Sequence, residues 1–383
     1  MSPRPTPTET SIPAIKAPPP VRDNPLTRSL AGVLGLGFLG LMLLLCLGTL
    51  PYTLGSVSDV AGSQASTPRY NAGQPREGRI PPAFWPKDDQ AILRLNSAVP
   101  ASTIEQVAAE LDMEPDAVIA QTEGPAADAL REHWPTPILG TDVLGRSLLV
   151  RSLTGGGISL GIGIAAALIS VFIGTLYGSI AAYMGGRVDA VMMRVVDILY
   201  GLPYILLVVL LAVAGDALVE QYIANTGTDL SRLQRSLIDV GILLVAIGGV
   251  SWLTMARVIR GQVLSLKARP FVEAARAVGA PGRRIFFRHL LPNVLGPVIV
   301  YATLTVPQAI LQESFLSFLG IGVKPPLPSW GNLAAEGLGE LNTFRSNWWL
   351  LFFPCLLLGT TLLALNFVGE GLREALDPRR ARR

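Results

Sequence analysis

The chain has 383 residues, of which 50% are hydrophobic and only 15% carry a charged side chain, and its formal net charge is +3. A soluble protein carries about a quarter charged residues. The composition therefore excludes an ordinary soluble enzyme or binding module and predicts an all-α, polytopic membrane protein.

Six apolar runs are long enough to cross a bilayer, because its hydrocarbon core is about 30 Å thick and a helix rises about 1.5 Å per residue. In chain order they are residues 29–50, 156–183, 198–217, 237–258, 291–315 and 348–367. We expect the third run to kink near its start, since Pro203 removes a backbone donor. Gly157, Gly161, Gly174 and Gly178 form two GxxxG spacings in the second run. Such spacings allow close helix packing, within this chain or against a partner.

Lys and Arg gather on one side of this topology. With an inside N-terminus, the inside segments carry 19 of the 31 Lys and Arg; they are residues 1–28, 184–197, 257–288 and 371–383. The segment 51–150 carries 7 Lys and Arg against 13 Asp and Glu. Because cytoplasmic loops are enriched in Lys and Arg, both termini are predicted to be cytoplasmic. The basic side would then face anionic membrane lipid.

Two segments outside the spans have distinctive compositions. Residues 1–28 are proline-rich and are predicted to be a disordered cytoplasmic tail. Residues 51–150 are predicted to be a partly helical extracytoplasmic insert, with a capping box at Ser102 and Glu105 that opens a helix to about residue 111. A second helix is expected over residues 114–121. The pair resembles a helix-turn-helix, but the eight acidic residues within 100–132 would repel a duplex, so nucleic acid is excluded as a partner.

No constellation of catalytic or metal-binding residues is visible in the sequence. Gly35, Gly37 and Gly40 fit a dinucleotide fingerprint by accident, because they lie inside an apolar run with no preceding strand. Cys46 and Cys355 also lie in apolar runs and form no disulfide framework. None of the four lysines follows a glycine, so a phosphate-binding GxxxxGK[ST] loop is absent. We therefore expect no catalytic residue, no metal site and no cofactor in this chain, and a membrane enzyme is disfavoured.

A short amphipathic helix is predicted from Pro270, whose fixed φ suits a first turn, to the C-cap at Gly279. Glu273 in the first turn complements the helix dipole. One apolar face is expected to contain Phe271, Ala274, Ala275 and Val278, at spacings i, i+3, i+4 and i+7. Arg276, Arg283, Arg284 and Arg288 surround it. A helix this short is unstable alone in water, so it needs a protein groove or a lipid surface, and the residues themselves leave both open.

The sequence around this helix resembles a known motif. Glu273-Ala274-Ala275 is followed at fixed spacing by Gly279 and then by Leu291-Pro292. This pattern is very similar to the EAA loop of ABC-transporter permeases, and His289 at the usual isoleucine position is similar to the peptide and nickel branch. Residues 139–146, 252–261 and 315–332 resemble the same branch. Over about residues 139–378 the chain resembles the C-type subunit of dipeptide and oligopeptide importers.

The resemblance implies a type I ABC importer permease fold, with a core over residues 151–370 that moves peptides across a prokaryotic plasma (inner) membrane by alternating access. It also implies a second permease subunit in a heterodimer, two cytoplasmic ATPase subunits that bind ATP and Mg, and an extracytoplasmic substrate-binding protein. The coupling loop would span residues 257–290. The residues expected to couple to the ATPase are Glu273, Ala274, Ala275, Arg276, Gly279, Arg283, Arg284, His289 and Pro292.

Two alternatives stay open: a stand-alone secondary transporter, and an ABC permease for nickel or another small solute. A secondary transporter would need carboxylates in broken helices at mid-membrane, and the middles of the six runs are almost free of charge. Glu313, near the outer end of the fifth run, is a candidate for the pathway or gate. Its structural alternative is a carboxylate satisfied by a neighbouring subunit or a backbone group. Arg194 and Asp197 are expected to form a surface pair.

Overall fold

The computed structural model describes residues 30–57, 66–227, 229–342 and 346–376. Residues 1–28 and 377–383, which include the predicted proline-rich tail and most of the predicted basic tail, lie outside the described residues. Within the described ranges the regular structure is helical, apart from the antiparallel pair of β1 (Ser56–Val57) and β2 (Thr67–Pro68). Two 3₁₀ turns follow this pair, η2 (Arg69–Asn71) and η3 (Pro75–Glu77). The predicted all-α class is confirmed.

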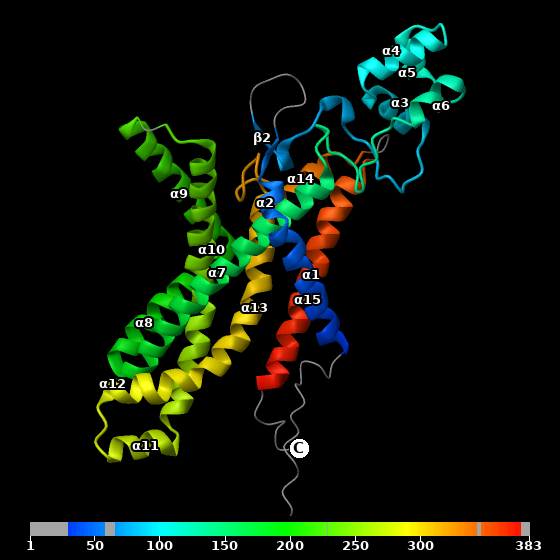
Figure 1. Cartoon of the computed structure of the whole chain (residues 1–383). Helices are drawn as coiled ribbons and strands as arrows, with labels where there is room; N and C mark the ends of the chain where they lie inside the picture. Colours follow the sequence, from blue (N-terminus) through cyan, green and yellow to red (C-terminus); the bar gives the residue numbers. More distant parts are fainter. Residues whose placement is uncertain (1–29, 58–65, 228, 343–345, 377–383) are drawn as a thin grey trace, which may run out of the picture.

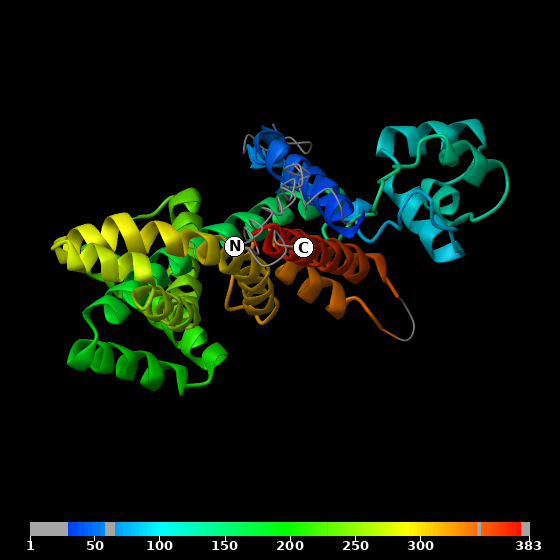
Figure 2. The same ribbon diagram turned by 90° about the horizontal axis from the view of Figure 1, so that it is seen from below.

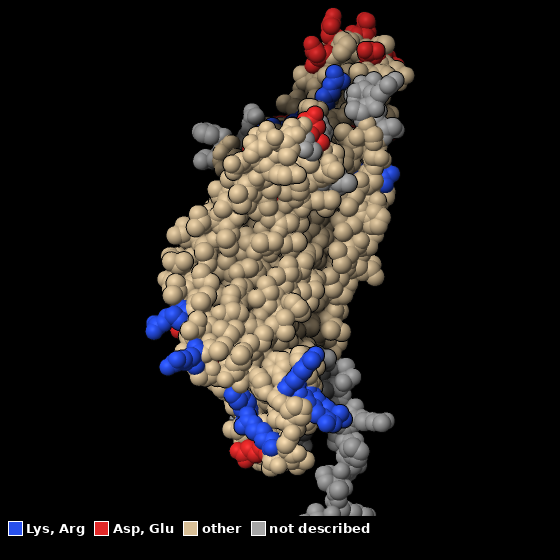
Figure 3. Space-filling view, turned by 90° about the vertical axis from the view of Figure 1, so that its left-hand side faces the viewer, with Lys and Arg blue, Asp and Glu red and all other residues tan. Residues whose placement is uncertain are grey.

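Six helical segments in the described part of the chain are long and apolar enough to cross a membrane, which confirms the predicted number. They are α1 with α2 (Leu30–Gly48 and Leu50–Thr53), α7 (Leu148–Met184), α9 (Tyr204–Thr226), α10 (Arg232–Lys267), the rod of α12, η4 and α13 (Gly282–Ile285, Phe286–Leu290 and Leu291–Phe318), and α15 (Trp349–Leu376). Successive spans alternate in direction (Figure 1). Figure 3 shows a wide belt without charged side chains, with Lys and Arg mostly below it and Asp and Glu mostly above.

The pair α7 and α10 forms the centre of the bundle. These helices have 37 and 36 residues and are about 55 Å long, well beyond the hydrocarbon thickness. Gly174 faces Met255 of α10, and Gly178 faces the backbone of Ala256 so closely that a Cβ would collide with it. The second GxxxG spacing therefore serves packing inside this chain. Gly161, in the first spacing, has no atom within 4 Å of a Cβ position.

The third span begins later than expected. Residues 186–200 form a separate helix, α8 (Gly186–Tyr200), and the chain breaks at residues 201–203 before α9 starts. The predicted interruption at Pro203 is therefore present, but it separates two helices instead of kinking a single span. Pro203 is the N-cap residue of α9, because it cannot donate a backbone hydrogen bond and so cannot continue α8.

Two ion pairs hold α8 against the lower half of α10. Arg260 donates to both oxygens of Asp189, each at 2.6 Å, and Arg257 donates to Asp197 at 2.7 Å. The hydrogen bonds from Arg260 lower the pKa of Asp189. The expected pairing of Asp197 with Arg194 was wrong, because Arg257 comes from a different helix that the local sequence does not reveal.

The insert contains a compact module of four helices: α3 (Asp89–Ala98), α4 (Ala101–Glu110), α5 (Pro115–Ala120) and α6 (Pro125–Arg131). Its own apolar core includes Val107, Val118 and Leu130. The predicted helix pair is present as α4 and α5. The predicted capping box is wrong, because α4 starts at Ala101 after Pro100 and no side chain caps it. Figure 1 shows the module above the upper end of α15.

A buried ionic network joins the 139–146 motif to α14 (Trp330–Gly339). Arg151 of α7 is 1% exposed and donates to Asp142 at 2.6 Å. It also makes two hydrogen bonds to Glu336 of α14, at 2.5 and 3.0 Å. Arg146 donates to the same Asp142 at 2.6 Å. The network therefore fixes the upper end of α7 to the 139–146 motif and to α14.

A second link, between Arg79 and Glu340, ties the insert to the end of α14, and it makes stability pH-dependent. Arg79 donates to both carboxylate oxygens, at 2.7 and 2.9 Å, and these bonds lower the pKa of Glu340 although partial burial opposes the shift. A lowered pKa stabilises the fold above the ordinary glutamate value of about 4.3 and loses that contribution as pH falls through the folded value. We expect Glu340→Gln to lower the thermal unfolding temperature at neutral pH, and the difference from the unmodified chain to shrink below about pH 4.3. A difference that does not change with pH would contradict this role.

Candidate functional site

The helix α11 (Pro270–Ala277) has the ends that its sequence predicts. Pro270 occupies its first turn, and Glu273 lies in the same turn. At the other end Gly279 has a φ of +79°. The Gly279 amide donates to the Arg276 carbonyl at 2.9 Å, and the Ala280 amide donates to the Ala275 carbonyl at 3.0 Å. These two bonds form a Schellman motif, which gives a very short helix a defined end.

The bundle contacts α11 through a residue outside its predicted apolar face. Val272 is completely buried in an apolar cluster with Ala182 of α7, Ile259 of α10 and Leu290. Phe271 is 41% exposed and Val278 is 89% exposed, and Ala274 is also exposed. Of the predicted apolar face, Phe271, Ala274 and Val278 thus stay exposed and free to meet a partner, and only Ala275 turns toward the bundle. The helix carries a second, exposed apolar face.

Exposed arginines lie on α11 and in the segment that follows it. Arg276, Arg283, Arg284 and Arg288 are all exposed, and among the described residues none of them has a carboxylate at ion-pair distance. Arg283, Arg284 and Arg288 line an open depression with Phe287 and Pro292. Figure 2 shows α11 and α12 at one end of the lower face, far from the α3–α6 module. An exposed apolar face with a positive rim suits a partner that has an apolar groove and acidic edges.

The segment is firmly attached to the spans. Lys267 donates to the carbonyls of Ala182 and Tyr183 at 2.8 and 3.1 Å, which closes the lower end of α7. The Tyr183 ring lies 5.2 Å from the ring of Phe286, which belongs to the π-turn η4. His289 is half-buried in the same turn. One apolar cluster thus joins α11 to residues of α7, α10 and α13.

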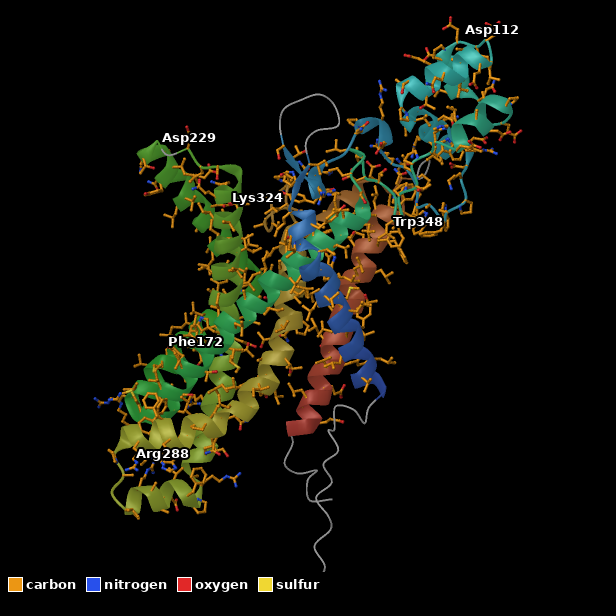
Figure 4. All side chains as sticks on the ribbon, in the orientation of Figure 1. Asp112, Phe172, Asp229, Arg288, Lys324 and Trp348 are labelled. Carbon is orange, nitrogen blue, oxygen red and sulfur yellow. The ribbon has the colours of Figure 1, made fainter. Side chains whose placement is uncertain are left out.

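The predicted loop 257–290 is mostly helical. Residues 257–267 are the last turns of α10, and residues 282–290 are the first turns of the fifth span. Only residues 268–281 connect the two spans. The apolar runs underestimate the lengths of both helices, because their charged end turns extend beyond the hydrocarbon core of a bilayer. Figure 4 shows Arg288 beside this short connection, at the lower end of the molecule.

A cavity of about 550 Å³ lies between the α8–α9 break, α10 and α13. Its walls are largely apolar, with a polar cluster at one position. The Tyr204 hydroxyl donates to Gln312 Oε1 at 2.6 Å and lies 2.8 Å from Ser251 Oγ. Thr254, Thr305 and Gln308 add further polar groups to the lining. None of these residues could be singled out in the sequence, because they come from three helices and show no local pattern. A mostly apolar hollow with a few convergent polar groups is typical of a ligand pathway.

Residues 174–382, more than half of the chain, match the family described as binding-protein-dependent transport system inner membrane component. The chain belongs to this family. The oligopeptide transport system permease protein OppC of Haemophilus influenzae is 47% identical over 240 residues, covering 63% of this chain and 70% of that protein. The dipeptide transport system permease protein DppC of Bacillus subtilis is 43% identical over 255 residues, covering 67% and 70%. The resemblance to ABC importer permeases is thereby confirmed.

Glu313 of this permease does not line the cavity, although its neighbour Gln312 does. Its carboxylate is completely buried and accepts hydrogen bonds from Ser317 at 2.7 Å and Ser314 at 3.2 Å. The hydroxyls of Ser159 on α7 and Ser329 before α14 also lie near this carboxylate. The geometry is that of a buried carboxylate hydrogen-bonded by hydroxyls of this chain.

Proposed function

We propose that this permease is the membrane subunit of an ATP-driven importer, and that α11 couples it to a separate ATPase. The observation that supports this most is α11 itself. It starts at Pro270 and ends in the Schellman motif at Gly279, it is held to the bundle through Val272, and it exposes an apolar face through Phe271 and Val278. The residues that would contact the ATPase are Glu273, Ala274, Ala275, Arg276, Gly279, Arg283, Arg284, His289 and Pro292.

The mechanism follows from this attachment. Closure of two ATPase subunits would move their grooves, and each groove would carry its docked helix with it. Because Val272 sits among residues of α7, α10 and the start of the fifth span, that displacement would tilt the spans around the cavity at Tyr204. The ATPase groove must differ between its two states for this coupling to work. ATP and Mg would be bound only by the partners, and this chain would have no catalytic role and no cofactor.

The proposed orientation puts α11 and both termini in the cytoplasm of a prokaryote and the acidic α3–α6 module outside the plasma membrane. The gathering of Lys and Arg around α11 supports it (Figure 3). A second permease subunit, in a heterodimer, would complete the pathway beside α9, α10 and α13. An extracytoplasmic binding protein would deliver cargo to the side of the module.

Peptides are the proposed cargo, because the similar proteins are named as oligopeptide and dipeptide permeases. Nickel or another small solute is the alternative within the same class. The test is to purify the chain with its native subunits, reconstitute them, and measure uptake of labelled peptides with and without ATP on the α11 side. We expect uptake only with ATP and with the binding protein present. Uptake by the isolated chain, driven by an ion gradient, would instead favour a secondary transporter.

The C-cap of α11 offers a specific prediction. A non-glycine residue at a φ of +79° costs about 1–2 kcal/mol, although nothing lies within 4 Å of a Cβ there. We expect Gly279→Leu to fray α11 and to reduce ATP-driven uptake several-fold while the protein still inserts. Gly279→Asn is the matched control, since asparagine tolerates this conformation and should retain most of the uptake. Equal uptake by both variants and the unmodified protein would argue against a need for a rigid helix.

A further inference from the structure

An aromatic strap connects the insert to the upper end of the last span. The strap, residues 81–87, reads Pro-Pro-Ala-Phe-Trp-Pro-Lys. Pro81 and Pro82 are buried, whereas Phe84 is 64% exposed and Trp85 is 44% exposed. Three prolines limit the backbone freedom of this segment, and the Ala83 amide donates to the Pro137 carbonyl at 2.9 Å. Two large apolar side chains are therefore held outward by a stiff segment.

These side chains lie against the first turn of α15. The Trp85 ring is 4.7 Å from the ring of Trp348, and the Phe84 ring is 6.3 Å from that of Phe353. Phe352 packs 5.5 Å from Trp348 and is itself 48% exposed. Figure 4 shows Trp348 where the strap meets the upper end of this span. The strap thus extends an aromatic cluster that begins inside a transmembrane helix.

The exposed surface of α15 continues below this cluster. Phe352, Leu356, Leu363 and Phe367 are 48%, 44%, 53% and 36% exposed, and their spacings of four and seven residues align them on one face. The span from Trp349 has 26 residues, about 39 Å, so its first turn lies in the interfacial zone of a bilayer with a core of about 30 Å. In such a bilayer Phe84 and Trp85 would be level with the headgroups, next to the upper end of the exposed apolar stripe.

We propose that the strap is an interfacial anchor that inserts Phe84 and Trp85 into the lipid leaflet on the side of the α3–α6 module. Aromatic rings favour this zone because one part of it is apolar and the other hydrated. Lys87, which is exposed beside them, can extend its ammonium toward phosphate groups. The anchor would hold the acidic α3–α6 module at the membrane surface beside the transmembrane helices. This role does not depend on a particular cargo or on coupling to ATP.

The test measures the depth of spin labels on the full chain in lipid nanodiscs, after Cys46→Ala and Cys355→Ser remove the native thiols. One label is placed at Phe84→Cys. Leu363→Cys on the exposed stripe of α15 is the lipid control, and Asp116→Cys on α5 is the water control. Each label is probed by its collisions with dissolved oxygen, which enriches in lipid, and with a neutral water-soluble paramagnetic chelate.

We expect the label at position 84 to have an oxygen-to-chelate collision ratio several-fold above that at position 116 and closer to that at position 363. A ratio equal to that of the label at position 116 would mean that the strap stands in water and would overturn the proposal. A label at position 84 that reaches neither reagent would mean that a protein surface covers the strap, and this outcome would overturn it as well. Because 64% of Phe84 is exposed, its substitution should leave the fold intact, and unchanged thermal unfolding checks this.

Discussion

The Val278→Glu variant is expected to insert normally but to lose ATP-driven uptake. Val278 is 89% exposed in this chain, so a glutamate there disturbs no internal packing. Docked in an apolar groove, however, an uncompensated carboxylate would cost about 3 kcal/mol or more. Such a cost weakens binding of the ATPase roughly 100-fold. The measurement is copurification of the ATPase with the tagged chain, together with uptake by the reconstituted complex.

Leu111→Glu is the matched control for this experiment. It also puts a carboxylate on an exposed apolar position, but at the end of α4 in the insert, on the opposite side of the membrane. We expect its copurification and uptake to equal those of the unmodified protein. If Val278→Glu behaved like Leu111→Glu, the exposed face of α11 would not be the docking surface.

The Arg151→Met variant should have the largest effect on stability. Its guanidinium, 1% exposed, bonds to both Asp142 and Glu336. Methionine would remove these bonds and leave Arg146 as the remaining partner, 2.6 Å from Asp142 and 3.7 Å from Glu336. Breaking a fully buried pair by removing one member costs about 3–5 kcal/mol, and because Arg146 remains and Glu336 is 38% exposed, we expect a loss near the lower end of this range. We expect the thermal unfolding temperature in detergent to fall by about 5 °C or more.

Arg131→Met provides the comparison for this effect. Arg131 pairs with Asp128 at 2.9 Å, but both side chains are largely exposed. Surface pairs contribute little because water screens them and ordering the side chains costs entropy. The unfolding temperature of this variant should match that of the unmodified protein. Equal shifts in the two variants would contradict a structural role for the buried network.

The sequence predicted features whose cause is local. Pro270 and Gly279 act through the backbone conformations that they favour, so both ends of α11 could be located without a structure. The six spans follow from apolar runs that must match the thickness of a bilayer. The break before α9 was only partly predicted. Its proline was recognised, but the apolar run continues across it and conceals the separate helix α8.

Features that depend on contacts between distant segments could not be predicted. Val272 is buried because α7, α10 and η4 meet around it, and no spacing within α11 indicates this. The hydroxyls around Glu313 come partly from Ser159 and Ser329, far away in the sequence. The polar cluster of Tyr204, Ser251 and Gln312 likewise joins three helices. In each case the contact can be recognised only once the packing of the helices is known.

The central claim, that α11 docks in a groove of a separate ATPase, is tested most directly by photocrosslinking. Ala277, which is exposed on α11, is replaced by cysteine in a chain without native cysteines and labelled with a benzophenone in the purified complex. We predict a covalent adduct with a subunit that carries a phosphate-binding loop, and no such adduct from a label at Asp116→Cys. An adduct with lipid alone, and none with an ATPase, would contradict the claim.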